Sequence, residues 1–237
     1  MQTANEIQSK YFNVAKVSLY VTILHRHAVE AFDGITSTET EPRLIKGLVF
    51  VISDDPVQDQ DSVHKVQELI HDYLTNETGY NTQKMHEFTD GSAAQYKSHH
   101  CSLADSSYQI QRNYYKTSHA KGEQDAAGSH VKQKVSHAVL RRTATINSAK
   151  TMHQYLVANF SQPASSNFGA RTNSVQLKCR KFFYVPSIGD EAVARNKPGR
   201  KFKAVDGVRK LHCIKSIPQQ EKLIVRNRSC YCVSCIA

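Results

Sequence analysis

The chain has 237 residues, an apolar fraction of 40% and a formal net charge of +10. Its longest apolar runs, at residues 17–24 and 47–52, are far too short to cross a bilayer, which excludes a membrane-spanning helix. The polar first six residues lack the apolar stretch of a signal peptide. We therefore expect a protein of the nucleus or cytoplasm that is not secreted and has no membrane partner.

The first two thirds of the chain alternate between predicted strands and predicted helices. Apolar and β-branched runs predict strands at residues 17–24, 48–52, 84–89 and 108–116. Helical spacing predicts a helix at 61–74, which Asp59 or Asp61 can cap. A long helical stretch follows at 126–156, with a break near 143–148. This alternation predicts an α/β fold with some parallel pairing.

The last third has a different composition and carries the excess positive charge. Residues 1–157 contain 16 Lys and Arg against 17 Asp and Glu, whereas residues 158–237 contain 15 against 4. Short β-like runs follow at residues 177–185, 202–205, 210–214 and 222–226. We expect a core at 1–157, a linker at 158–170 and a small basic β-rich module at 171–237.

Such a charge asymmetry favours a polyanionic partner, and nucleic acid is the commonest one. Basic and aromatic residues alternate in the module, which suits contact with phosphates and stacking on bases. The candidate nucleic-acid contacts there are Lys178, Arg180, Lys181, Arg200, Lys201 and Lys203. A solvated basic surface, with the aromatic residues forming the core of the module, is the alternative.

Two acidic residues stand at positions that suit a metal site. Asp90 follows the predicted strand at 84–89, and Asp125 follows a Gly-containing loop that enters a helix. Carboxylates at the ends of strands can bind the Mg²⁺ or Mn²⁺ ions that phosphodiester chemistry uses. The alternative is structural: Asp90 is a turn residue, and Asp125 caps a helix.

Polar residues flank both acids. His119 and Lys121 precede Asp125 and can contact a phosphate at the reaction centre, whereas Gln95 and Lys97 follow Asp90 and can face the DNA backbone. A polar loop is the alternative for His119 and Lys121, and an exposed helical face explains Gln95 and Lys97 equally well.

Three cysteines lie close to the C-terminus. Cys230, Cys232 and Cys235 offer soft ligands for Zn²⁺, and His212 or Cys213 could supply the fourth. The spacing differs from the usual two separated pairs, so free thiols are the alternative.

These motifs together resemble those of a group of transposase-derived proteins of invertebrates. That group carries an "SDG…Q(F/Y)K" motif, an "HGKG..D..GG" motif and a cysteine-bearing tail. The matching residues are Thr89-Asp90-Gly91 with Gln95-Tyr96-Lys97, then His119, Lys121, Gly122, Asp125 and Gly128, then Arg228, Cys230 and Cys232. The resemblance implies an RNase H-like mixed sheet flanked by helices, three acidic residues that bind two metal ions, and DNA strand cleavage and transfer.

The chain departs from the pattern of this group. The first acidic residue of the group lies on a strand before the segment that Glu6-Ile7-Gln8-Ser9 matches, and this chain begins at Met1. We therefore expect a core without its first strand and an activity that is lost or impaired, because two carboxylates hold a divalent ion less well than three. A non-catalytic nucleic-acid-binding protein and a degenerate fragment are the alternatives, and a homo-oligomer is left open.

Overall fold

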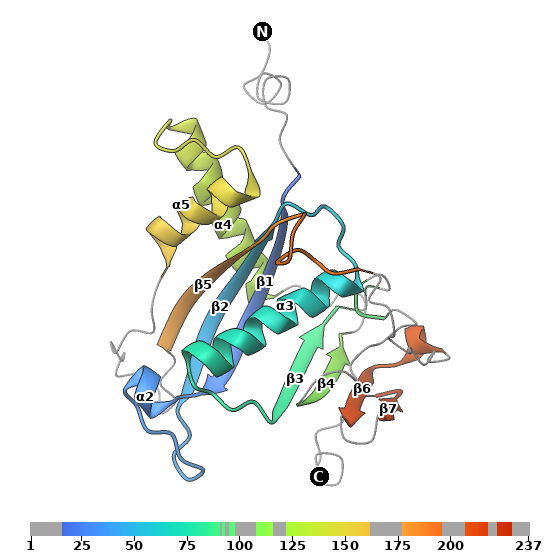
Figure 1. Cartoon of the computed structure of the whole chain (residues 1–237). Coiled ribbons are helices and arrows are strands. Elements are labelled where there is room, and N and C mark those ends of the chain that lie inside the picture. Colours follow the sequence, from blue (N-terminus) through green and yellow to red (C-terminus); the bar gives the residue numbers. More distant parts are fainter. Residues whose placement is uncertain are drawn as a thin grey trace. The chain divides into compact units, whose positions relative to one another are not determined.

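The computed structural model describes residues 16–90, 92, 95–97, 108–115, 122–161, 177–195, 207–217 and 222–228. This part of the chain is mixed α/β, with four α-helices and two mixed sheets (Figure 1). It divides into two compact units. The first consists of the described residues within 1–57, 68–79 and 122–194, and the second of those within 58–67, 80–121 and 195–237.

The first unit contains a three-stranded sheet in the order β1-β2-β5. β1 (Ser18–His27) runs antiparallel to β2 (Leu44–Ser53), and β5 (Leu177–Val185) runs parallel to it. The residues from Val49 to Ser53 are all buried. An unbroken buried run is typical of a central strand that is covered on both faces. The strands predicted at 17–24, 48–52 and 177–185 are thus confirmed.

Two helices cover one face of this sheet. α4 (Glu123–Leu140) packs on β1, and α5 (Ala149–Phe160) packs on β2 and β5. The predicted break falls in the gap between them, where Ser148 and Thr151 form a reciprocal capping box at the start of α5. The core beneath them includes Phe50 and Phe182, which stack at 4.9 Å between ring centroids.

The opposite face of the same sheet packs against a π-helical turn. This turn, η1 (Tyr73–Glu77), follows α3 (Gln60–Asp72) directly. The Tyr73 ring meets the Phe183 ring edge-on at 6.3 Å. Burial raises the pKa of the Tyr73 hydroxyl, which lies close to the Cys179 thiol. A short helix, α2 (Glu30–Asp33), completes the described elements of this unit.

The second unit contains a four-stranded sheet in the order β3-β4-β6-β7. β3 (Lys84–Thr89) and β4 (Gln109–Tyr114) are parallel, whereas β6 (Cys213–Ile217) and β7 (Lys222–Arg226) continue the sheet with antiparallel pairing. One face of the sheet carries the core, which includes Tyr108, Ile110, Tyr114, Leu211 and Ile214. The strands predicted at 84–89 and 222–226 are confirmed at the same residues.

A buried ion pair lies within this unit. Arg112 is 2% exposed, and its Nε donates to Glu87 Oε2 at 2.8 Å. Gln67 also donates to the Glu87 carboxylate. Such pairs are retained only where several hydrogen bonds compensate for the loss of water.

The two units group the C-terminal residues differently from the predicted division of the chain. β5 belongs to the sheet of the first unit, because Phe182 stacks on Phe50 and the strand pairs with β2 along its length. β6 and β7 instead extend the sheet of the second unit, where Cys213 pairs with Asn113. The predicted strand at 210–214 begins later, at Cys213, because residues 208–210 form a 3₁₀ turn (η3, Val208–Lys210). The predicted strand at 202–205 lies outside the described residues.

Candidate functional site

Asp90 stands directly after β3 in the second unit, at the carboxyl end of a strand that is parallel to its neighbour. Its side chain is exposed, and its Oδ1 accepts a hydrogen bond from the backbone N–H of Ser92 at 3.1 Å. This bond is the local turn contact that Asp commonly makes with a residue two positions on. Asp90 thus makes the turn contact that the structural alternative expects. Its exposed carboxylate can still reach a cation.

Asp125 lies in the first turn of α4, in the first unit. The helix begins after Gly122, whose backbone is the N-cap, so Asp125 does not cap the helix with its side chain. Its backbone N–H donates to the Gly122 carbonyl oxygen at 3.1 Å, and its side chain is exposed. An acid in a first helical turn is stabilised by the positive end of the helix dipole. This position is compatible with both a structural role and a metal ligand.

Asp90 and Asp125 belong to different units, so their joint binding of Mg²⁺ or Mn²⁺ stays a prediction. Among the described residues, the structure contains no group of three or more His, Cys, Asp or Glu side chains arranged to hold a metal. The cysteines at positions 230, 232 and 235 lie outside the described residues, as do His119 and Lys121.

Gln95 and Lys97, the residues predicted to face DNA, make contacts within the second unit. Gln95 Nε2 donates to Gln58 Oε1 at 3.3 Å. Lys97 is buried, donates from Nζ to the Arg209 carbonyl oxygen at 3.1 Å and lies over the Tyr114 ring at 4.6 Å. Burial lowers the pKa of the Lys97 ammonium. A phosphate contact from Lys97 would therefore require this side chain to leave its present partners.

The acidic residues after β2 have structural roles. Asp59 Oδ1 accepts from the Ser62 backbone N–H at 2.9 Å, which confirms Asp59 as the cap of α3. Asp54 accepts from the Tyr184 hydroxyl and, at 3.2 Å, from the Ala149 backbone N–H at the start of α5. The hydrogen bond to Asp54 raises the pKa of the Tyr184 hydroxyl to about 12.

The described basic residues of β5 point to opposite faces of the sheet. Lys181 forms an ion pair with Glu77 at 2.5 Å and lies over the Tyr73 ring at 5.3 Å. Arg180 is half-buried on the face that α4 and α5 cover, where it lines a pocket. Lys178 belongs to the same strand. Arg200, Lys201 and Lys203 lie outside the described residues.

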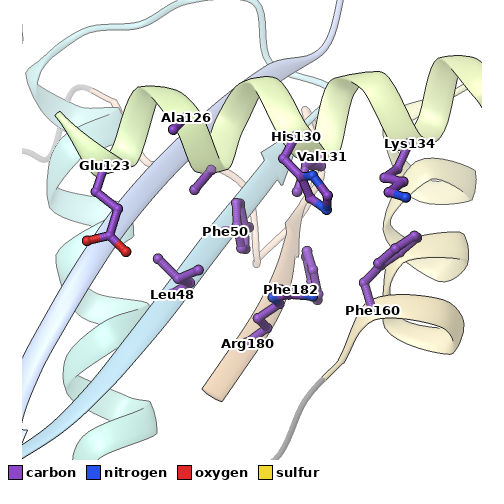
Figure 2. Close-up of a pocket in the computed structure, with 11 residues that line it drawn as sticks. Leu48, Phe50, Glu123, Ala126, His130, Val131, Lys134, Phe160, Arg180 and Phe182 are labelled. Atoms are coloured by element: carbon purple, nitrogen blue, oxygen red, sulfur yellow. The ribbon is translucent and has the colours of Figure 1, made fainter. Parts of the chain in front are cut away.

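This pocket is hollowed beneath α4 in the first unit, with a volume of about 250 Å³ (Figure 2). Its floor is the apolar face of β2 and β5, and α4 forms the opposite wall. The apolar lining consists of Leu48, Phe50, Phe182, Val131, Phe160, Ala126 and Ala127. Four polar side chains also line it: Glu123, His130, Lys134 and Arg180.

The polar side chains of the pocket give it two different ends. Glu123 stands at the start of α4 and forms an ion pair with Lys46 of β2. Lys134 lies three turns further along the helix, towards Phe160 (Figure 2). No described carboxylate forms an ion pair with Lys134 or Arg180. The Lys134 end is therefore the one that favours an anion.

The spacing of residues along the chain carries part of the signal for this pocket. Glu123, His130 and Lys134 are spaced by seven and four residues, which places them on one face of a helix. Arg180 and Phe182 are two residues apart and share one face of a strand. The pairing of β5 with β2 brings the two faces together, and a pattern along the chain does not reveal that pairing.

Comparison with known proteins identifies one family. A family model described as "Domain of unknown function (DUF8701)" matches residues 1–229 of the chain, which include parts of both units. No curated protein and no solved structure matches. The described helices include none that is long and apolar enough to cross a membrane.

Proposed function

The chain belongs to the family of the domain of unknown function DUF8701, and we propose that it is a transposase-derived, DNA-binding protein with an RNase H-like core. In this proposal Asp90 and Asp125 contribute to one divalent metal site, the remainder of a centre for DNA strand cleavage and transfer. The resemblance of the sequence motifs to transposase-derived proteins is the starting point.

The observation that carries the proposal is the position of the two acids on their elements. Asp90 follows β3 directly, β3 pairs in parallel with β4, and Asp125 lies in the first turn of the helix that comes next in the described chain. Sites in mixed and parallel sheets lie beyond the carboxyl ends of the strands. Both carboxylates are exposed, so a hydrated divalent cation can reach them.

The order of elements also supports an RNase H-like core. An antiparallel pair, β1 and β2, is followed by helix α3, by the parallel pair β3 and β4, and by helix α4. β1 and β3 each pair with one described strand only, so each has an edge to which a further strand can be added. The proposal requires a strand beside each of these edges.

The partner is inferred from charge. The chain carries a net charge of +10, and 15 of its 31 Lys and Arg residues lie after residue 157. Binding to DNA releases counterions from its phosphates, so the logarithm of the affinity should fall linearly with the logarithm of the salt concentration. We expect strong binding and slow or absent cleavage, because the motifs supply two of the three acids that the resemblance implies.

The test uses the full chain and two measurements. Fluorescence anisotropy with a labelled DNA duplex, at salt concentrations from about 50 to 200 mM, should show an affinity that falls by at least about tenfold. An affinity that salt does not change, or no binding, would contradict the proposal. Plasmid nicking in Mg²⁺ or Mn²⁺ should be weak or absent. Strong nicking that Asp90→Ala abolishes would show that the metal centre is intact and the expected impairment is wrong.

A nucleic-acid-binding protein without metal chemistry is the second candidate. The Asx-type turn at Asp90 and the dipole position of Asp125 favour it, because both acids then have structural roles. It predicts the same salt dependence and no effect of Asp90 or Asp125 on metal binding. Measured metal binding therefore separates the two candidates.

A further inference from the structure

We propose that the pocket beneath α4 binds one nucleotide of a single-stranded nucleic acid, with the base against Phe160 and the phosphate contacted by Lys134 or Arg180. This inference rests on the proposed function for its class of partner, a nucleic acid. It adds a specific site and a single-stranded ligand. It uses only residues of the first unit.

The size of the pocket suits one planar ring with its substituent. Its volume of about 250 Å³ lies just below the range of roughly 300–1,000 Å³ that drug-sized ligands occupy. A dinucleotide would not fit, whereas one nucleotide could enter with its neighbours outside. The pocket opens at the surface, as its exposed His130 and Lys134 show, so a strand could continue past it.

The lining suits an aromatic ring. Phe160 lies at the end of α5, where its ring centroid is 5.9 Å from that of Tyr155, so Tyr155 supports its position. Phe160 is half-buried, and part of its surface faces the pocket (Figure 2). Phe182 also lines the pocket, and its stacking on Phe50 holds its ring in place. Stacking of bases on aromatic side chains tolerates any sequence, because every base has a π-face.

The cations of the lining favour a phosphate. Lys134 and Arg180 both line the pocket, and neither pairs with a described carboxylate. The one acid of the lining, Glu123, is partly neutralised by Lys46. An Arg fork and a Lys ammonium are the usual donors to phosphate oxygens. An anion gains the attraction of these two cations and an apolar partner does not, which makes an aromatic anion the better occupant.

Helix α4 offers a matched control for the test. Lys132 and Lys134 are both exposed on this helix, but Lys132 does not line the pocket, because two residues of an α-helix differ by about 200° in direction. Lys132→Gln and Lys134→Gln thus remove the same charge from the same helix. Phe160→Leu removes the aromatic ring and keeps an apolar side chain.

The experiment measures binding of a fluorescein-labelled (dT)12 strand to the full chain and to these variants. Lys134→Gln should weaken binding by roughly three- to tenfold and reduce the salt slope by about 0.7, the loss of one phosphate contact to a single strand. Phe160→Leu should weaken it by at least about fivefold. Lys132→Gln should change it by less than about twofold. Equal effects of Lys132→Gln and Lys134→Gln would overturn the proposal, since a general positive field would then explain binding.

Two further arms identify the ligand. Free dTMP should bind much more weakly than the strand. A chain that binds dTMP but not (dT)12 would contradict the proposal that the nucleotide belongs to a single-stranded nucleic acid. Duplex DNA is measured in parallel: if it binds normally while Lys134→Gln leaves (dT)12 binding unchanged, the pocket assignment fails and the proposed function stands. If the duplex is not bound but (dT)12 binding depends on Lys134 and Phe160, the pocket assignment stands and the proposed binding of duplex DNA fails. A thermal melt of each variant checks folding, and Lys134→Gln alone decides the matter if Phe160→Leu does not fold.

Discussion

Asp59 holds the beginning of α3 in two ways. Its Oδ1 accepts from the Ser62 backbone N–H at 2.9 Å, and its Oδ2 accepts from Arg195 Nε at 2.6 Å. Burial alone would raise the pKa of this carboxyl, but the hydrogen bonds from Arg195 and Ser62 outweigh burial and lower it below its ordinary value of 3.8. One side chain thus joins a helix cap to an ion pair.

The stability that Asp59 contributes should depend on pH. Because its pKa is lower in the folded state, the contribution is fully present above about pH 4 and is lost as the pH falls through the lowered pKa. Asp59→Asn keeps a capping side chain but loses the charge, so we expect it to cost about 0.5–1 kcal/mol at pH 7. Asp59→Ala loses the cap as well and should cost about 1–2 kcal/mol.

Urea denaturation of wild type and Asp59→Asn between pH 7 and pH 2.5 measures this effect. The difference in the free energy of unfolding should shrink towards the acid end of the range. A difference that stays constant with pH would show that the charge of Asp59 contributes nothing.

At the scale of elements, the parallel pairing of β2 with β5 brings Gly47 close to Cys179. Gly47 pairs with Cys179, and a Cβ atom added at Gly47 would lie 3.0 Å from Cys179 Sγ. The thiol is buried, so it has little room to move. A glycine in a central strand is otherwise unfavourable, by about 0.5–1 kcal/mol relative to alanine. Close approach of the two strands explains why it is tolerated here.

Gly47→Ala should therefore destabilise the protein less when the Cys179 thiol is absent than when it is present. In the Cys179→Ala background, we expect the effect of Gly47→Ala on the free energy of unfolding to improve by at least about 0.5 kcal/mol. A double-mutant cycle with urea denaturation measures the coupling. Additive effects of the two substitutions would mean that Gly47 and Cys179 are not in contact, and would count against this register.

The sequence predicted individual elements well where local patterns decide them. The strands at 84–89, 177–185 and 222–226 have the predicted bounds, because runs of alternating or apolar residues specify them locally. The π turn at Tyr73–Glu77 could not be predicted, since the packing of Tyr73 on Phe183 of a distant strand accompanies it. Asp59 was one of two predicted caps, and only the structure distinguishes it from Asp61.

At the scale of the whole molecule, the grouping of strands could not be derived from the sequence. A change in composition near residue 161 suggested that a separate module follows. The strands beyond it instead complete two sheets that earlier strands begin, β5 beside β2 and β6 beside β4. Pairing between distant strands depends on side-chain contacts across the sheet, such as that of Phe50 with Phe182. The pattern of residues along the chain does not specify these contacts. The pocket beneath α4 depends on the same pairing of β2 with β5, so the sequence does not predict it either.

The two candidate ligands, Asp90 and Asp125, were found because each lies next to a recognisable motif. Their positions on the elements agree with a metal site, and their contacts also agree with structural roles. Whether they share an ion is the central question about this molecule.

Mn²⁺ binding, followed by electron paramagnetic resonance of the free ion, answers it most directly. We predict one Mn²⁺ site, and we expect Asp90→Asn and Asp125→Asn each to weaken its affinity by at least about tenfold, because each substitution removes a charged ligand from the same ion. Asp190→Asn, an exposed carboxylate in a loop, is the matched control and should have no effect. Binding that neither substitution changes, or two separate Mn²⁺ sites of which each substitution removes one, would contradict a shared metal site.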